Sequence, residues 1–484
     1  MALRGFASSD GLGCDATEIA QSDLRSTSAC LMILSAAPAI LPGTILERSQ
    51  SLFGLFAFIL ICYVIGKAYG SRKFPTRVVI WGIILQFAFG ALVLFSPKML
   101  ATVQAGIQNL LAYSDSGARL LFGSLVDWVT QARDSNGQEV GSVVLAASFA
   151  FSVLPTIMFV SMLTAILYHL GVMTWIVSGV AWIMHKTTGT SGAETLSTAA
   201  NIFVGQTEAP LLVRPFLATA TRSEMFVIMV GGFANIATGV LVFYALLLND
   251  FVQNVGGHLA AACLISAPAT LVVSKLIMPE SEKPQTAAGV AFNVERLDAN
   301  LIDAATRGTS EGLKLAVNVG AMLITFTALI ALLNALVGWA TGAVGLGATS
   351  IGADGNTIYS GWKIEQMLGV VFAPLAWLCG IPWADSPKVG GLLGMKTVLN
   401  EFIAYNEMAQ QFKADPNFLS PRSALIAVYA LCGFANFASV GIQIGGISVL
   451  APSRRHDLSR IGLLAMFGGA IATMMGACVV GVLT

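Results

Sequence analysis

The sequence has little charge. Asp, Glu, Lys and Arg make up 11% of its 484 residues, whereas soluble domains carry about 25%. That is too little charge to cover the water-facing surface of a soluble chain of this length. The 26 acidic and 26 basic residues also cancel, so the sequence offers no excess of positive charge for a nucleic acid. A soluble protein and a nucleic-acid partner are therefore both excluded.

Cysteine and histidine are few and scattered. The seven cysteines contain no C-x-x-C pair, and several lie inside apolar runs, where a thiol acts as a small apolar side chain. The four histidines show no H-E-x-x-H or comparable ligand spacing. The sequence therefore predicts neither a disulfide scaffold nor a Cys/His metal centre.

Apolar sequence dominates instead, at 56% of the chain. A helix needs about 20 mainly apolar residues to cross a bilayer, and eight stretches are candidates. They predict an all-α polytopic membrane protein whose partner is the lipid bilayer. The candidates are Leu52–Ala68, Val78–Phe95, Val143–His169, Phe226–Leu248, Leu259–Met278, Leu313–Val344, Ser423–Leu450 and Ile461–Leu483.

Three further segments have the character of surface helices. Met99–Gly123 has an apolar stripe at helical spacing and is predicted to lie on the membrane. Val172–Met184 and Met367–Trp383 are too short to cross and are predicted to be interfacial, the second broken by Pro374 and Pro382.

The most informative feature is an internal repeat. The sequence G-F-A-N-x-A occurs twice and places Asn235 and Asn436 in the middle of two predicted spans. Asparagine among small residues has low helix propensity, so both spans are expected to unwind there. Each copy follows an apolar segment with polar residues at its centre, Leu196–Ala218 or Gly390–Met408, which is the pattern of a re-entrant hairpin.

The repeating unit is span, surface helix, hairpin, broken span and span. One unit crosses the membrane three times, so the second copy must be inverted, an architecture typical of secondary transporters. Lys and Arg placement predicts that both termini lie outside. The predicted segments are a disordered extension (1–50), two scaffold spans with the amphipathic helix (51–142), repeat 1 (143–278), a polar linker (279–312) and repeat 2 (313–484).

The hairpin tips carry carboxylates. Gln206, Thr207 and Glu208 lie at the first tip, and Asn400 and Glu401 at the second, with no Lys or Arg within either tip. A carboxylate at membrane depth costs about 3 kcal/mol unless it meets a partner or a cavity, so both are functional candidates. An amide beside a carboxylate offers the donor and acceptor that a nucleobase edge requires. The alternative is a glutamate bonded to backbone N–H groups of its own hairpin.

Four segments resemble those of the concentrative nucleoside transporters. They are G-Q-T-E-A-P (205–210), A-P-L-A-W-L-C-G-I-P-W (373–383), N-E-F-I-A-Y (400–405) and G-F-A-N-F-A-S (433–439). The resemblance runs from about residue 50 to the end of the chain. It implies a homotrimer in the plasma (inner) membrane that imports nucleosides with a cation, by elevator-type movement of a transport domain against a scaffold.

The resemblance also implies which residues bind. The nucleobase residues are Gln206, Thr207 and Glu208, the flanking residues are Val240 and Phe434, and the ribose residues are Glu401, Asn436 and Ser439. No resident cofactor is implied. The implied sodium ligands are Asn201, the Val204 carbonyl, Asn235 and the Ile236 carbonyl. Residue 235 departs from the family pattern, because a hydroxyl residue is usual there. An amide oxygen also ligates hard cations, and proton-coupled members exist, so sodium and proton coupling both stay open.

Other function classes fit the sequence less well. A membrane enzyme needs a nucleophile with a base or a metal cluster, and Ser439 has neither His nor Lys nearby in the sequence. A channel needs a continuous polar path, whereas polar hairpin tips indicate a closed central site. A cation-coupled carrier of a different small polar substrate remains the alternative within transporters.

Overall fold

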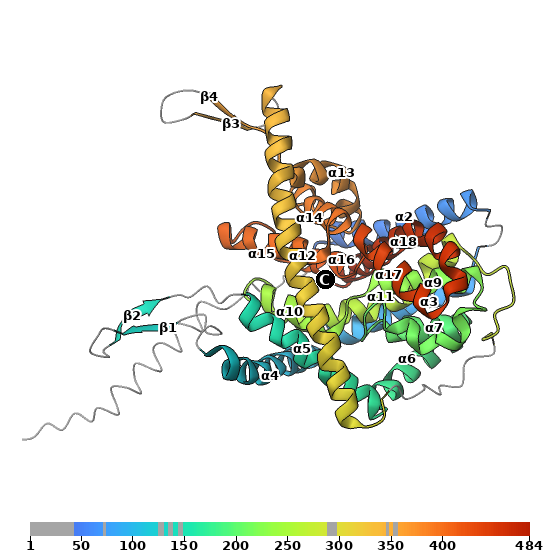
Figure 1. Ribbon diagram of the computed structural model, residues 1–484. Coiled ribbons are helices and arrows are strands. Elements are labelled where there is room, and N and C mark those ends of the chain that lie inside the picture. Colours follow the sequence, from blue (N-terminus) through green and yellow to red (C-terminus); the bar gives the residue numbers. More distant parts are fainter. Residues whose placement is uncertain are drawn as a thin grey trace, which may run out of the picture.

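The computed structural model describes residues 43–70, 74–123, 130–133, 139–143, 149–287, 298–344, 348–351 and 357–484. Helices dominate these residues (Figure 1). Two antiparallel β-hairpins depart from the all-α prediction, and both project from the helical body (Figure 1). Their strands are β1 (Thr130–Arg133) with β2 (Glu139–Val143), and β3 (Ala348–Ile351) with β4 (Thr357–Ser360). Val143 thus belongs to a strand, and the described helix of the span predicted from Val143 is α5, which starts at Phe149.

Two series of helices follow one another in the same order along the chain. After α2 (Ile45–Ala68), α3 (Thr76–Leu94) and α4 (Pro97–Phe122), the first series is α5 (Phe149–His169), α6 (Val172–Thr188), α7 (Gly192–Ala200), the 3₁₀ helix η2 (Ala209–Val213), α8 (Arg214–Leu217), α9 (Arg222–Ala234), α10 (Thr238–Leu248) and α11 (Val255–Ile277). The second is α12 (Leu301–Ala343), α13 (Ile364–Leu378), α14 (Ser386–Val398), α15 (Glu401–Ala414), α16 (Pro421–Leu431), α17 (Phe437–Leu450), the 3₁₀ helix η3 (Pro452–Arg454) and α18 (Arg455–Leu483).

Five helical stretches among the described residues are long and apolar enough to cross a membrane. They are α2, α3, α9 with α10, α11, and η3 with α18; a sixth is the pair α5–α6, bent by 76°. In α9–α10 and in α11, 89% of the apolar window is buried, against 39% in α2 and 33% in α3. The stretch that contains the first break therefore lies inside the bundle, and α2 and α3 lie at its periphery.

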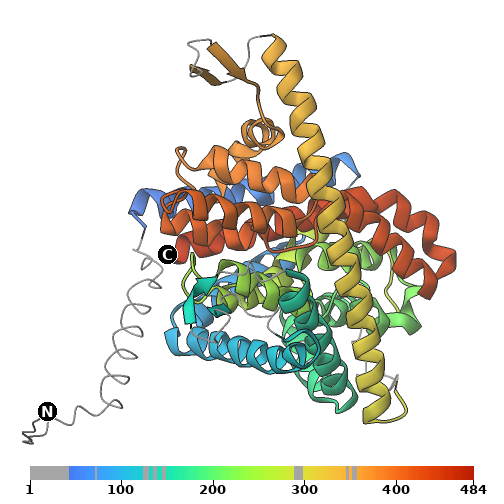
Figure 2. The ribbon, with the colours of Figure 1, turned by 60° about the vertical axis from the view of Figure 1, so that its left-hand side comes forward.

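Helix α12 runs along the bundle from one end to the other (Figures 1 and 2). It begins at Leu301 rather than Leu313, so the segment predicted as a polar linker contains its first turns. Asn300 caps this start, because its side-chain oxygen accepts from the N–H groups of Ile302 and Asp303 at 3.0 Å each. Helix α12 packs on α5 through small residues: a methyl group added at Gly308 would lie 2.8 Å from the Met162 Cα.

Both predicted helix breaks are present. Helix α9 ends at Ala234 and α10 begins at Thr238, while α16 ends at Leu431 and α17 begins at Phe437. The predicted break at Pro374 is wrong, because α13 continues through this proline to Leu378. Interior prolines are tolerated in apolar helices whose neighbours compensate for the lost hydrogen bond.

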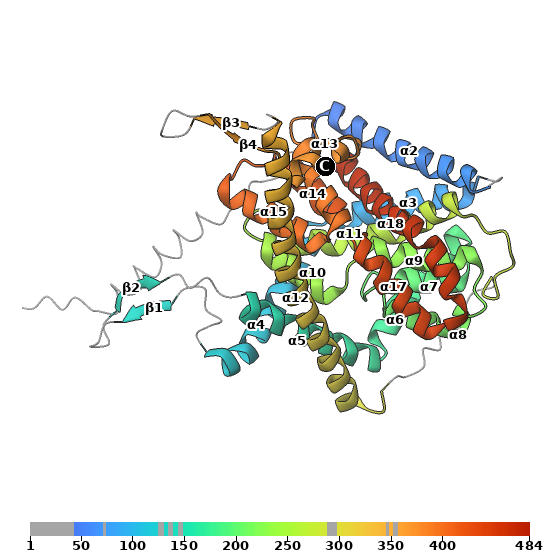
Figure 3. The ribbon, with the colours of Figure 1, turned by 45° about the horizontal axis from the view of Figure 1, so that its top comes forward.

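Part of the segment predicted as a disordered extension belongs to the fold. Thr44 and Glu47 form a capping box at the start of α2, with Thr44 N–H to Glu47 Oε2 at 2.8 Å. The Gly43 N–H donates to the Thr484 carbonyl at 2.6 Å, so residues 43–50 belong to the fold. The rest of the predicted extension, residues 1–42, lies outside the described residues. Helix α2 also runs beside α18 (Figure 3).

Gly54 allows the close approach of α2 to the end of α13. A methyl group there would lie 1.6 Å from the Leu378 carbonyl oxygen, whereas one at Gly106 on α4 would meet nothing within 4 Å. We expect Gly54→Ala to lower the apparent melting temperature of the purified protein by several degrees, because overpacking costs about 1–3 kcal/mol. The matched control, Gly106→Ala, should leave it unchanged or raise it slightly. Equal melting temperatures for the two variants would contradict this packing.

Candidate substrate and cation site

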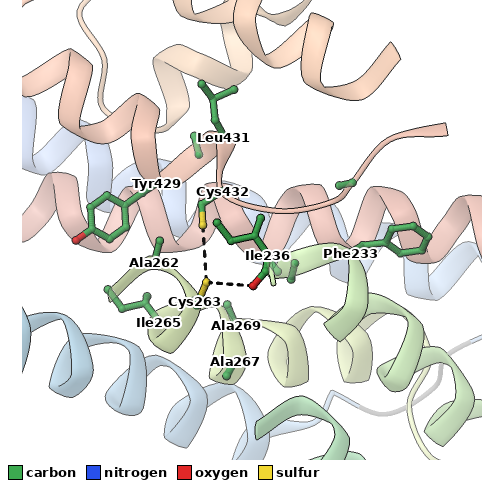
Figure 4. Packing of buried hydrophobic residues seen from close by; sticks show 14 of the residues in the cluster. Phe233, Ile236, Ala262, Cys263, Ile265, Ala267, Ala269, Tyr429, Leu431 and Cys432 are labelled. Carbon is green, nitrogen blue, oxygen red and sulfur yellow. Dashed lines mark hydrogen bonds between the residues drawn. The ribbon is translucent and has the colours of Figure 1, made fainter. Parts of the chain in front are cut away.

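The two helix breaks lie against each other. The Phe434 N–H in the second break donates to the Asn235 carbonyl in the first at 3.4 Å. Cys263 on α11 contacts both sides, with its Sγ 3.9 Å from Cys432 Sγ and 4.0 Å from the Ile236 carbonyl oxygen (Figure 4). Two segments about two hundred residues apart in sequence therefore form one backbone junction inside the bundle.

The two asparagines of the repeated motif make different hydrogen bonds at this junction. Asn436 caps α17, since its Oδ1 accepts from the Ser439 N–H at 2.8 Å, and its Nδ2 donates to Glu401 Oε2 at 3.2 Å. Asn235 instead donates back to the Gly231 carbonyl at 3.2 Å. Its Oδ1 is buried without a hydrogen-bond partner among the described residues. Both ends of the Asn436 side-chain amide are thus hydrogen-bonded, whereas the side-chain oxygen of Asn235 is free among the described residues.

Four predicted substrate residues form one hydrogen-bonded chain. Gln206 at the first hairpin tip donates through Nε2 to Ser439 Oγ at 3.3 Å. The backbone N–H of Ser439 donates to Asn436 Oδ1, and Asn436 Nδ2 donates to Glu401 at the second tip. Tyr244 on α10 donates to Glu401 Oε1 at 2.8 Å. The structure therefore brings Gln206, Glu401, Asn436 and Ser439 together across both tips and both breaks.

Two residues of this network were not predicted. Gln443 on α17 donates to Gln206 Oε1 at 3.1 Å and to the Met229 carbonyl at 3.2 Å. Its place could have been predicted, because residues 436, 439 and 443 lie on one helix face. Tyr244, an aromatic residue within an apolar run, gives no comparable sequence signal.

Glu208 lies on the wall of a cavity. This cavity, about 540 Å³ in volume, lies between the first hairpin, α5, α6, the start of α10 and α12. Phe203, Val204 and Gly205 form its wall beside Glu208, and Ala237, Thr238 and Gly239 line it next to them. Thr238 Oγ1 donates to the Phe203 carbonyl and so holds the hairpin tip to the first break.

The remaining predicted substrate residues lie near the hydrogen-bonded network or near the cavity. Val240 is buried next to the cavity wall at Gly239, and Phe434 is half-buried in the second break. Thr207 packs against α17, where a methyl group added at Gly446 would lie 2.9 Å from Thr207 Cγ2.

The cavity has an excess of negative charge. Among the described residues, its charged lining consists of Glu208, Asp298 and Glu311, with Arg307 as the one guanidinium. Arg307 Nε lies 2.6 Å from Asp298 Oδ1, and Nη1 lies 3.0 Å from Glu311 Oε2. The hydrogen bond from Arg307 holds the pKa of the Asp298 carboxyl below its usual range. No cationic group of the described lining forms an ion pair with Glu208, so the cavity favours ligands with hydrogen-bond donors or positive charge.

Free oxygen atoms gather where the first hairpin meets α9 and α11. Asn201 donates through Nδ2 to the Ser197 carbonyl at 3.0 Å, so its oxygen points away from that bond. Within the described part of the chain, Asn201 Oδ1, Thr198 Oγ1 and Thr270 Oγ1 are buried without partners, as is Asn235 Oδ1. Unpaired buried oxygens are costly, and oxygen ligands suit hard cations. The predicted sodium ligands Asn201 and Asn235 therefore fit a cation.

Comparison with known proteins decides the family. Profiles described as the N-terminus and the C-terminus of Na⁺-dependent nucleoside transporters match residues 53–125 and 258–481, and one described as nucleoside recognition matches 150–251. The transporter YutK of Bacillus subtilis, itself uncharacterised, is 40% identical, over 89% of this chain and 98% of YutK. The chain belongs to the Na⁺-dependent nucleoside transporter family. The predicted membership is confirmed, and the family is one of transporters rather than enzymes.

Another relative and two solved structures also match most of this chain. Solute carrier family 28 member 3 of Eptatretus stoutii is 39% identical over 89% of this chain, and the chain spans 60% of that relative's length. The solved structure of CNTnw in an inward-facing substrate-bound state is 36% identical, with a TM-score of 0.77 over 90% of this chain and 97% of that one. An outward-facing variant of CNTnw gives a TM-score of 0.79. The protein is therefore a multi-pass helical membrane protein with the concentrative transporter fold.

Buried charges fix the base of the first hairpin of this transporter. Lys275 on α11 bonds the Glu194 carboxylate on α7 and donates to Ser223 Oγ at 2.8 Å. Ser191, the cap of α7, donates to Glu224 Oε1 on α9 at 2.7 Å. These bonds join α7, α9 and α11 at the base and leave the oxygens near the tip free for a ligand.

Tyr244 supplies a hydrogen bond that orients Glu401. Hydrogen bonds to charged groups contribute about 1.5–3 kcal/mol, so Tyr244→Phe should weaken nucleoside binding about 10- to 100-fold. Tyr405→Phe is the matched control, because Tyr405 is equally buried but donates to the Val428 carbonyl at 2.7 Å. Binding can be measured by titration calorimetry on both purified variants. Equal affinities in Tyr244→Phe and Tyr405→Phe would contradict a role for Tyr244 in the site.

Proposed function

We propose that this protein is a secondary active transporter that moves nucleosides across the membrane with sodium. The single observation that carries this proposal is the hydrogen-bonded chain from Gln206 to Glu401, which joins both hairpin tips across paired helix breaks. Discontinuous helices that meet near the midplane are where secondary transporters bind their substrates. CNTnw, which shares the fold, is known in inward-facing and outward-facing states. This supports alternating access, and we propose that the movement is of the elevator type.

The substrate site is proposed to open when the hydrogen-bonded chain is exchanged for ligand contacts. Gln206 and Glu208, with Thr207 beside them, would bind the nucleobase edge. Glu401, Asn436 and Ser439 would bind the ribose hydroxyls, which can both donate and accept. Val240 and Phe434 are proposed to supply apolar contact. Each polar group that loses a protein partner then gains one from the nucleoside, so the loaded domain carries no unpaired group into the bilayer.

The coupling ion is proposed to be sodium, held by Asn201, the Val204 carbonyl, Asn235 and the Ile236 carbonyl. The support is the pair of buried, unpartnered amide oxygens on Asn201 and Asn235 in the described structure. Glu208 and Val204 both line the same cavity wall. A cation there would offset the negative charge of the wall and order the tip that carries Gln206.

We further propose that residues 143–278 and 313–484 form inverted repeats, that the protein is a homotrimer, and that it resides in the plasma (inner) membrane. The recurring order of the two helix series supports the repeat.

Imposed gradients test the proposed function. In proteoliposomes, an inward sodium gradient should drive accumulation of uridine or adenosine, and a proton gradient without sodium should not. Asn235→Ala removes one oxygen ligand and should raise the sodium concentration for half-maximal uptake about tenfold, equivalent to about 1.4 kcal/mol. Asn417→Ala, at an exposed position, should behave as wild type. Accumulation driven by protons alone would contradict sodium coupling, and accumulation under neither gradient would contradict the function.

The two tip carboxylates should be indispensable for uptake. Glu208→Gln and Glu401→Gln each keep the side-chain shape but replace an acceptor-only group with one that also donates. Both should reduce nucleoside uptake to the level of empty liposomes while the purified proteins elute like the wild type. Glu282→Gln, in an exposed loop, is the control. Wild-type uptake by either tip variant would refute the role of that residue.

A further inference from the structure

A lysine lies buried in the arm of the second hairpin. Lys396 on α14 is 2% exposed, and the mechanism above gives it no role. Its Nζ donates to the Ala430 carbonyl at 2.9 Å and to Thr473 Oγ1 at 3.1 Å. An ionisable side chain at membrane depth requires an explanation in terms of the charge that it meets.

The ammonium group lies at the end of a broken helix. Ala430 is in the last turn of α16, which ends at Leu431. Carbonyls of a last helical turn lack partners within the helix and carry the negative end of its dipole. Thr473 on α18 also donates to the Ala430 carbonyl, at 3.1 Å. Lys396 therefore stands where hairpin, broken helix and final helix meet in the second half.

In the first half the corresponding helices α7, α9 and α11 meet around Gly231, and the nearest described side chains there are uncharged; Lys275 lies at the base of these helices instead. Around Gly231 of α9, the Asn201 and Thr198 side chains from α7 and its end meet Thr270 from α11: an added methyl group would lie 3.2, 3.7 and 3.6 Å from their nearest atoms. Here the oxygens of Thr198, Asn201 and Thr270 are buried without partners among the described residues. The repeat motif places Asn235 just beyond this junction, as it places Asn436 beyond the junction of Lys396.

We infer that Lys396 is a tethered cation, which occupies in the second half the place that a mobile cation takes in the first. Its ammonium group neutralises the end of α16 and acts as the counter-charge of Glu401, which lies on the same hairpin. The second hairpin then needs no mobile ion to keep Glu401 ionised for the ribose. This inference rests on the proposed function for the mobile ion but is tested without it.

A double-mutant cycle on thermal stability tests the pairing of the two charges. Lys396→Met leaves Glu401 without a counter-charge, and Glu401→Gln leaves Lys396 without one, so each should lower the apparent melting temperature. The double variant removes both charges and should melt above Lys396→Met, because paired groups couple non-additively. Losses that simply add, or a wild-type melting temperature for Lys396→Met, would overturn the inference.

Matched variants separate charge from packing. Lys396→Arg keeps the charge and should melt closer to the wild type than Lys396→Met does. Lys413→Met removes an exposed lysine on α15, the other arm of the same hairpin, and should leave the melting temperature unchanged. If Lys396→Met cannot be purified, recovery of the double variant supports the inference. Loss of the double variant while Glu401→Gln is purified overturns it. The cycle needs neither nucleoside nor sodium, so its failure is distinct from failure of the uptake test.

Discussion

A helix that is interrupted inside a bilayer must find partners for its open backbone groups, because no water is present there to supply them. This constraint shapes the molecule around the junction of two breaks. The Phe434 N–H bonds the Asn235 carbonyl, and Asn436 closes the first turn of α17. The hairpin tips then complete the polar lining, with Gln206 on one side and Glu401 on the other. Because the bonds made by Phe434, Gln206 and Glu401 join segments that are distant in the sequence, the junction is also where a substrate can couple the two halves.

The charges inside the bundle divide into fixed and exchangeable sets. Lys275 forms an ion pair with Glu194 at the base of the first hairpin, and Arg307 forms one with Asp298 on the cavity wall. These pairs do not require a ligand. Glu208 and the oxygens of Asn201 and Asn235 remain for exchangeable partners. If Lys396 is the counter-charge of Glu401, the second half is electrically complete, and only the first half depends on an ion from solution. An asymmetry between two otherwise similar halves then links substrate affinity to the ion.

Sequence reasoning succeeded where a residue conflicts with its surroundings. Asn235, Asn436 and the tip glutamates are polar within apolar runs, and their positions at breaks and tips followed from that conflict. Lys396 is likewise a charged residue within an apolar segment, but it lies in a hairpin arm rather than at the tip. Its position in the sequence therefore gave no indication of its partners. Tyr244 is unremarkable in an apolar span, since only the fold brings it to Glu401. The break at Pro374 was wrong because neighbouring helices support α13, and the start of α12 was missed because its first turns are polar.

Reciprocal binding of ion and nucleoside tests the central claim most directly. The claim is that the oxygens of Asn201 and Asn235 hold an ion beside the tip that binds the nucleobase. The measurement is the nucleoside dissociation constant of the purified protein by titration calorimetry, with sodium replaced stepwise by choline. We predict that sodium tightens nucleoside binding by a factor of about 5 to 150, and that nucleoside tightens sodium binding by the same factor. A nucleoside dissociation constant that is identical in sodium and in choline would contradict it.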